Sequence, residues 1–147
     1  MTLITGNSTS RVIDCQTDPF GLGRWSYFII RGKDRVKILV ITAYCVCVQS
    51  AAMAGPKTST SQQFQRLSKT FWLADRTDDP IPRIQFIMDL QAWIEHHVQK
   101  GCSIILGIDG NESMASSTGN FTPLPYTLDK PIQCKGHDGS LATLIRT

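Results

Sequence analysis

The stretch SIILGIDGNE, residues 103–112, decides the fold of this chain. Its aliphatic residues run up to a turn that contains Asp109 and Asn111. A short aliphatic run bounded by turn formers predicts a buried strand, and buried strands belong to sheets covered on both faces. We therefore expect Asp109 and Asn111 where the strand leaves the sheet, an edge where α/β proteins bind ligands.

Two interpretations of this turn remain open. A carboxylate and an amide two residues apart can bind a metal, orient a water or hold a phosphate oxygen. Asp-Gly and Asn are also ordinary turn residues, so the segment could be a turn and nothing more. An EF-hand loop is excluded, because it needs Gly and Glu at positions occupied by Met114 and Asn120.

The composition predicts one globular domain. The chain has 147 residues, of which 41% are hydrophobic and 18% charged. The net charge of +3 is compatible with a polyanionic partner. The 5 cysteines form neither a zinc pair nor a C-x-x-C motif. With no secretory signal or membrane-spanning stretch evident, we expect buried, reduced thiols and a location in the nucleus or cytoplasm.

The pattern of elements predicts an α/β fold, with a mixed, mostly antiparallel sheet packed by helices. Phe64, Leu67 and Phe71 recur at helical spacing after residue 59 or 60, and a Ser or Thr just before them is the expected N-cap. A second helix should begin near Pro82 and end at Gly101. The residues expected on its core face are Ile84, Ile87, Leu90, Ile94 and Val98. The predicted strands cover residues 1–5, 11–16, 24–31 and 36–44 and the aliphatic run from Ser103 to the turn at Asp109, the first two paired as a hairpin. Residues 113–130 should form a loop, and residues 140–146 should begin a last helix.

Three further residues are candidates for a site. Tyr44 ends the longest strand and could reach a phosphate oxygen, although a rim tyrosine is the simpler interpretation. Arg24 and Trp25 follow a Gly-x-Gly loop, where Arg could bind phosphate and Trp could stack on a base. The alternative for this pair is a structural loop with a core tryptophan. Neighbouring His96 and His97 lack the spacing of a zinc-binding helix.

The chain as a whole resembles the endonuclease/exonuclease/phosphatase superfamily, and within it the endonucleases of non-LTR retrotransposons, which are associated with reverse transcriptases. The resemblance implies a partial four-layer α/β sandwich. It also implies hydrolysis of DNA phosphodiester bonds with Mg²⁺ or Mn²⁺ as cofactor. The segments that carry the resemblance are residues 18–32, 38–47, 55–63, 82–94 and 103–112.

The resemblance assigns roles to individual residues. Asp109 and Asn111 fit the G-D-x-N motif, in which Asp positions the attacking water and Asn helps to hold the phosphate. The motif is altered here to I-D-x-N, because Ile108 stands between Gly107 and Asp109. Tyr44 falls on the tyrosine of the I-x-A-Y-R strand, a contact to the phosphate. The arginine after it is replaced here by Cys45. Glu112 matches an acidic residue often found after the Asn and, with Asp109, is a possible metal ligand.

The chain also departs from the superfamily pattern. The metal-binding Glu of the first strands and the carboxyl-terminal Asp-His pair have no counterpart, since His137 and Asp138 stand in the reverse order. We therefore expect a domain truncated at both ends, with weak or no activity alone. Two alternatives stay open: a non-catalytic retroelement remnant that binds nucleic acid, and a phosphatase of the same fold.

Overall fold

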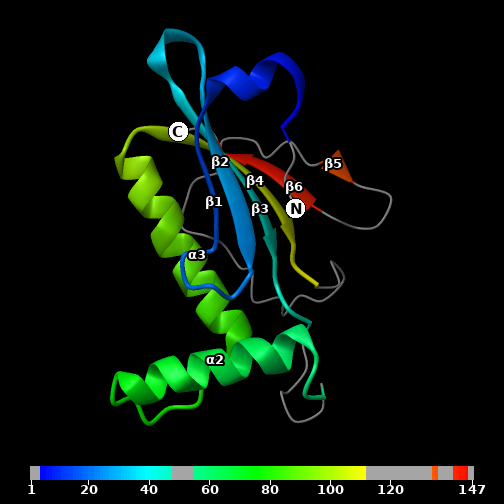
Figure 1. Cartoon of the computed structure of the whole chain (residues 1–147), viewed down its shortest axis with the longest axis vertical. Helices are drawn as coiled ribbons and strands as arrows, with labels where there is room; N and C mark the ends of the chain where they lie inside the picture. Colours follow the sequence, from blue (N-terminus) through cyan, green and yellow to red (C-terminus); the bar gives the residue numbers. More distant parts are fainter. Residues whose placement is uncertain (1–3, 48–54, 112–133, 136–140, 146–147) are drawn as a thin grey trace.

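The computed structural model describes residues 4–47, 55–111, 134–135 and 141–145, with side chains for the first two of these ranges. The strands form one sheet in the order β1-β2-β3-β4-β6-β5, and the helices α2 and α3 lie between β3 and β4 in the sequence (Figure 1). The elements are β1 (Val12–Thr17), β2 (Trp25–Arg31), β3 (Lys37–Tyr44), α2 (Ser59–Leu73), α3 (Pro82–Gln99), β4 (Cys102–Asp109), β5 (Cys134–Lys135) and β6 (Leu141–Ile145), with short 3-10 helices at Gly6–Arg11 and Lys33–Arg35.

The sheet is mixed and mostly antiparallel, which confirms the α/β class predicted from the sequence. Within it, β3 and β4 form the one parallel pair among the described strands. Parallel strands require a long crossover, and α2 with α3 provides it. Because β3 and β4 run the same way, their carboxyl ends reach the same edge of the sheet.

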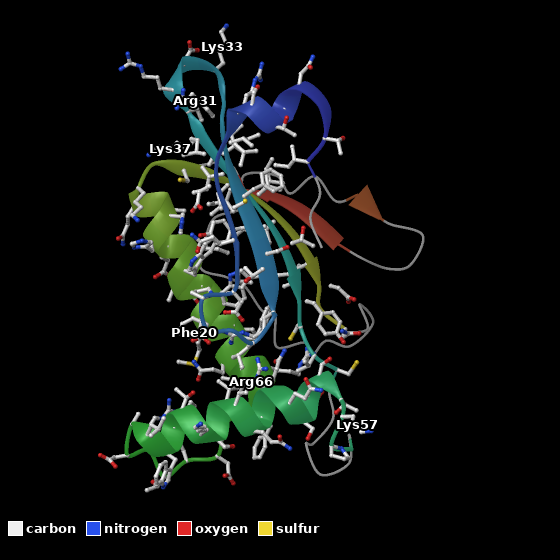
Figure 2. All side chains as sticks on the ribbon, viewed as in Figure 1. Phe20, Arg31, Lys33, Lys37, Lys57 and Arg66 are labelled. Atoms are coloured by element: carbon white, nitrogen blue, oxygen red, sulfur yellow. The ribbon has the colours of Figure 1, made fainter. Side chains whose placement is uncertain are left out.

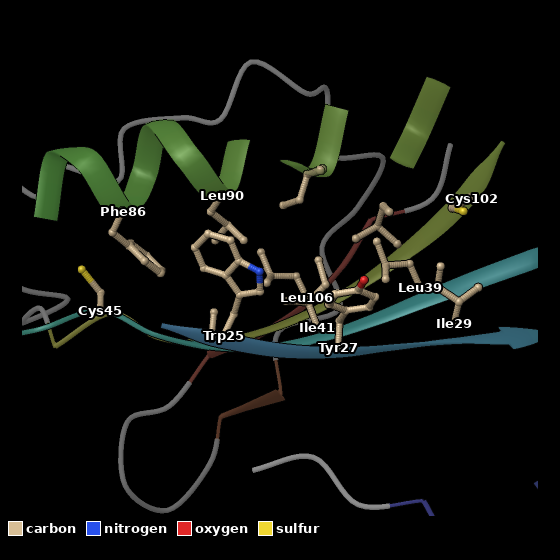
Figure 3. Close-up of a cluster of buried hydrophobic side chains, with 13 residues drawn as sticks. Trp25, Tyr27, Ile29, Leu39, Ile41, Cys45, Phe86, Leu90, Cys102 and Leu106 are labelled. Carbon is tan, nitrogen blue, oxygen red and sulfur yellow. The ribbon is translucent and has the colours of Figure 1, made fainter. Parts of the chain in front are cut away.

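The core lies between the sheet and α3 (Figure 3). Alternate residues of β3 and β4 point to it, so that Leu39, Ile41 and Ile104 are at most 1% exposed. From α3, Phe86 and Leu90 pack against this face. The aliphatic run from Ser103 is therefore a central strand, as predicted, but the described residues bury it on the α3 side alone, because Ile105 on the other face is 37% exposed.

The apolar face of α3 is the predicted one at Leu90 and Ile94, with Ile87 and Val98 packed beside them, and differs at Ile84. Helical spacing placed Ile84 among the core residues, but its side chain is 46% exposed, while Phe86 is 1% exposed. Phe86, Leu90 and Ile94 recur every four residues and face the sheet. Pro82 occupies the first turn as expected, and Gly101, with φ +75°, turns the chain into β4.

The start of α2 agrees with the sequence prediction. The Thr58 side chain caps the helix by accepting a hydrogen bond from the Ser61 backbone N–H. Leu67 and Phe71 are buried, whereas Phe64 is half-buried. No described helix is both long and apolar enough to cross a membrane.

Two predictions at the ends of the chain are wrong. Strand β1 pairs with β2, the described residues Ile4 and Thr5 lie outside any strand, and Gly6–Arg11 form a 3-10 helix where the hairpin was expected. Residues 141–145 form strand β6, antiparallel to β4, instead of a helix. Periodicity does not separate a short apolar helix from a strand, and the free edge of β4 offers this segment backbone partners. The predicted loop 113–130, His137 and Asp138 lie outside the described residues.

Candidate functional site

Tyr44 and Asp109 lie opposite each other at the carboxyl ends of β3 and β4. The strand pairing extends one bond further, because the Cys45 backbone N–H donates to the carbonyl oxygen of Asp109 at 2.9 Å. The side chains of Tyr44 and Asp109 lie on the outer face of the sheet, opposite α3. Successive residues of a strand point to opposite faces, and the preceding residues Ala43 and Ile108 are turned to the core. We call Tyr44, Asp109 and Asn111 the β3–β4 edge site.

Asn111 is fixed to both strands by hydrogen bonds. Its backbone N–H donates to Oδ1 of Asp109 at 3.1 Å, which closes an Asx turn. Its side-chain Nδ2 donates to the carbonyl oxygen of Cys45 at 2.7 Å. The segment is therefore a turn, and the same turn holds an amide next to a carboxylate. Asp109 remains exposed, with acceptor capacity to spare.

The electrostatics of Tyr44 also reflect this cluster. Burial raises the pKa of the Tyr44 hydroxyl, and the nearby Cys47 thiol raises it further. The charge of Asp109 acts in the same direction, whereas a hydrogen bond from Asn111 lowers the pKa. The hydroxyl therefore stays protonated at neutral pH and can donate a hydrogen bond. With 39% of the residue exposed, it is accessible to a ligand.

Arg83 supports the site from α3, and sequence reasoning missed it. Its guanidinium donates to the carbonyl oxygen of Val46 at 2.5 Å and to that of Gly110 at 3.2 Å. It thus ties the segment after β3 to the turn after β4, and it is 6% exposed. The signal available in the sequence is that Arg83 stands three residues before Phe86 and seven before Leu90, on the same helix face, but no pattern identifies its hydrogen-bond partners.

Arg24 and Trp25 have structural roles in the described chain. Arg24 is fully buried and forms ion pairs with Asp18 at 2.7 Å and Asp89 at 2.6 Å. Trp25 is 3% exposed and packs against Phe86. The prediction that Arg24 binds phosphate and Trp25 stacks on a base does not agree with this placement, because both side chains are engaged in the interior.

The histidines and cysteines divide between surface and interior. His97 is buried and its Nδ1 lies 3.1 Å from the Trp93 carbonyl oxygen, whereas His96 is exposed. Cys45 and Cys102 are buried, as expected of structural thiols. Cys15 and Cys47 are exposed, which corrects the expectation that the thiols are buried.

A metal site is incomplete within the described residues. No group of three or more His, Cys, Asp or Glu side chains gathers there. Asp109 offers one exposed carboxylate, and Mg²⁺ binds through one or two carboxylates together with waters and substrate oxygens. Glu112, the other possible ligand, lies outside the described residues. Among the described residues, the Asp109 carboxylate therefore suits an Mg²⁺ ion whose remaining ligands are phosphate oxygens and waters.

Comparisons of the chain with models of protein families, with curated proteins and with solved structures found no match. Function is therefore inferred from the geometry of the β3–β4 edge site.

Proposed function

We propose that the β3–β4 edge site binds a phosphodiester group of DNA and takes part in Mg²⁺-dependent phosphodiester hydrolysis, with weak or no activity in this chain alone. The observation that supports this most is the convergence of Tyr44, Asp109 and Asn111 at one edge. These are the residues to which the resemblance to endonucleases of the endonuclease/exonuclease/phosphatase superfamily assigns contacts with phosphate and water.

Each side chain suits a separate task. The protonated Tyr44 hydroxyl can donate to a non-bridging phosphate oxygen. The exposed Asp109 carboxylate can accept from a water and orient it toward phosphorus, while Asn111 keeps that carboxylate in place. Mg²⁺, held by Asp109 and the phosphate, would polarise the phosphoryl oxygen. The missing cationic contact at Cys45 and the short donor set are why we expect weak activity.

The outer face of the sheet supports a sandwich fold of the same superfamily. On the face opposite α3, the apolar side chains of Phe28, Ile30 and Val40 are only half-buried, and Ile105 is 37% exposed. Sheets with an apolar outer face pack against a second sheet about 10 Å away. We therefore propose that the described sheet is one half of a four-layer α/β sandwich.

A second candidate function is binding of nucleic acid without catalysis. The observation in its favour is that Cys45 stands where the superfamily has an arginine after the tyrosine, so that a cationic contact to the phosphate is missing. The net charge of +3 suits either function. The two candidates differ in one respect: only the hydrolase requires Asp109 and Mg²⁺ for a chemical step.

The test combines cleavage with binding. Supercoiled plasmid is incubated with the intact chain in Mg²⁺ or EDTA, and binding of a labelled DNA oligonucleotide is followed by fluorescence anisotropy. We expect little or no nicking, Mg²⁺-strengthened binding that is lost in Asp109→Ala, and weaker binding in Tyr44→Phe. Strong nicking that is sensitive to EDTA and absent in Asp109→Ala would show that the chain is fully active. Binding that responds neither to Mg²⁺ nor to either substitution would refute the site.

A further inference from the structure

The turn between β2 and β3 carries the excess positive charge of the chain. Residues 31–37, RGKDRVK, which we call the basic hairpin, hold four of the 15 basic residues and one of the 12 acidic residues. Eleven basic and eleven acidic residues remain outside this segment, so the rest of the chain is formally neutral and the net charge of +3 belongs to the basic hairpin. A surface with this concentration of charge attracts polyanions.

The cations of the basic hairpin are exposed and mutually repulsive. The side chains concerned are those of Arg31, Lys33, Arg35 and Lys37. Arg31 and Lys37 are direct partners in the antiparallel pairing of β2 with β3, and like charges that face each other across two strands repel. Within the described residues, no ion pair or side-chain hydrogen bond neutralises any of the four. An anionic ligand would relieve this repulsion.

The basic hairpin projects beyond the strands on either side of it. In the sheet register, β1 begins opposite Ile30 and β4 begins opposite Lys37. Residues 32–36 therefore extend past both neighbouring strands. Figure 2 shows Arg31, Lys33 and Lys37 gathered at this end of the molecule, with α2 at the other end. A two-stranded β-ribbon that projects in this way fits the major groove of B-form DNA.

The backbone at the tip of the hairpin has a conformation that favours glycine. The Val36 backbone N–H donates to the carbonyl oxygen of Lys33 at 3.1 Å and closes a four-residue turn. The two central residues of this turn, Asp34 and Arg35, have φ values of +56° and +65°. Left-handed φ at both central positions is typical of type I′ turns, where glycine is favoured. An arginine in this conformation is strained, and such strain is concentrated at binding sites.

We propose that the basic hairpin is a binding surface for the phosphate backbone of a double-stranded nucleic acid. Guanidinium groups such as those of Arg31 and Arg35 pair with phosphate oxygens through two parallel hydrogen bonds. Regularly spaced phosphates neutralise several cations at once and release the counterions condensed on the nucleic acid. Val36 is the only apolar side chain of the segment, which is too little to anchor in a lipid bilayer. The composition therefore favours a nucleic acid over a membrane surface.

The basic hairpin is separate from the β3–β4 edge site. Lys37, at the hairpin, is the first residue of β3, and Tyr44, at the edge site, is the last. With 8 residues and a rise of about 3.3 Å per residue, the two ends of this strand lie roughly 25 Å apart. A phosphate bound at one end does not contact the other. The basic hairpin therefore does not rest on the proposed function.

The experiment measures binding of short labelled duplexes of DNA and of RNA to the intact chain by fluorescence anisotropy, in EDTA and over a range of salt concentrations. Four phosphate contacts on DNA should give a slope of about −3 to −4 in a plot of log affinity against log salt concentration. The double variant Lys33→Gln/Arg35→Gln should reduce this slope by about 2 and weaken binding at least about tenfold at low salt. Lys69→Gln/Arg76→Gln removes the same charge from exposed positions of α2 and the residues after it and should leave the slope unchanged.

The substitution Arg35→Gly separates binding from folding. Glycine adopts a φ of +65° without strain, so the urea midpoint of the variant should be unchanged or higher than that of the unmodified chain. Affinity for the duplex should nevertheless fall severalfold, because the guanidinium is lost. A retained or raised midpoint with unchanged affinity would mean that the hairpin is only structural and would overturn the proposal.

Controls separate this surface from the edge site and from a membrane. Binding in EDTA should persist in Asp109→Ala. If Mg²⁺ fails to strengthen binding while the hairpin variants still weaken it, the proposed function fails and the basic hairpin stands. The tighter of the two duplexes identifies the nucleic acid. Equal affinities of the hairpin and control variants for both duplexes would refute the surface, as would tighter binding to vesicles of phosphatidylcholine and phosphatidylserine than to either duplex.

Discussion

Arg24 and Asp89 form a buried ion pair that joins the sheet to α3, with Nη1 of the arginine 2.6 Å from Oδ2 of the aspartate. The same guanidinium donates from Nε to Asp18 in the loop before β2, at 2.7 Å. Arg24 is fully buried, and Asp89 is 13% exposed at its side chain. One arginine thus connects three segments of the chain in the interior.

Replacing Arg24 should destabilise the chain strongly. Arg24→Met leaves two carboxylates inside without their partner, and breaking a buried pair in this way costs about 3–5 kcal/mol. Asp89→Asn should cost less, because an amide oxygen still accepts from the guanidinium. Urea unfolding followed by circular dichroism measures both. Arg76→Met, which removes an exposed ion pair with Asp78, is the control, and an Arg24→Met midpoint equal to the control would contradict this account.

The Arg24 pairs also show where sequence reasoning stops. Local features were predicted correctly because their signals are local: the aliphatic run of β4, the Thr cap before α2 and Pro82 at the start of α3. Arg24 and Asp89 are 65 residues apart in sequence, and no periodicity relates them. An arginine after a glycine loop suits a phosphate ligand as well as a buried ion pair, and only the packing of α3 decides between them.

The residues of the candidate site could be predicted where their signals are local, and could not be predicted where they depend on contacts between distant segments. Tyr44, Asp109 and Asn111 each stand at a strand end, and the resemblance to a nuclease family relates them. Arg83 could not be predicted, since its partners are backbone carbonyl groups on two other segments. Strand β6 was missed because its partner, the edge of β4, exists only once the sheet has formed.

Arg83 should hold the edge site in place. Arg83→Met removes the donors to the carbonyl groups of Val46 and Gly110, each of which costs about 1–3 kcal/mol when left unpaired. We expect faster hydrogen exchange in peptides that cover residues 44–47 and 106–111, measured by mass spectrometry. Arg31→Met removes an exposed arginine at the far end of β2 and should leave these peptides unchanged. Equal exchange in the two variants would mean that Arg83 does not support the edge.

His97 should make the chain less stable in acid. Burial lowers the pKa of His97, and the hydrogen bond to the Trp93 carbonyl only partly offsets this. Below the unfolded pKa of about 6.5, the unfolded chain therefore binds more protons than the folded chain, and stability falls as pH falls. Thermal unfolding at pH 7.5 and pH 5.5 measures the loss.

The contribution of His97 can be separated from that of the carboxylates by substitution. His97→Gln removes the titrating group, so the difference in melting temperature between the two pH values should shrink. The neighbouring His96 is exposed, and His96→Gln should retain most of the difference, because the charge of His96 lowers the pKa of His97 less than burial does. If both variants respond to pH like the unmodified chain, His97 does not control this stability.

A substitution at Asn111 can distinguish a turn that is only structural from a turn whose amide group takes part in the edge site. Its φ of +47° is a left-handed conformation that glycine adopts without strain. Asn111→Gly removes the bond from Nδ2 to the Cys45 carbonyl oxygen, which costs about 1–3 kcal/mol, and relief of the left-handed strain offsets part of that loss. The variant should therefore stay folded at the temperature of the binding assay. If the segment is only a turn, anisotropy should show unchanged DNA binding by the folded variant; if the amide serves the edge site, affinity should fall severalfold.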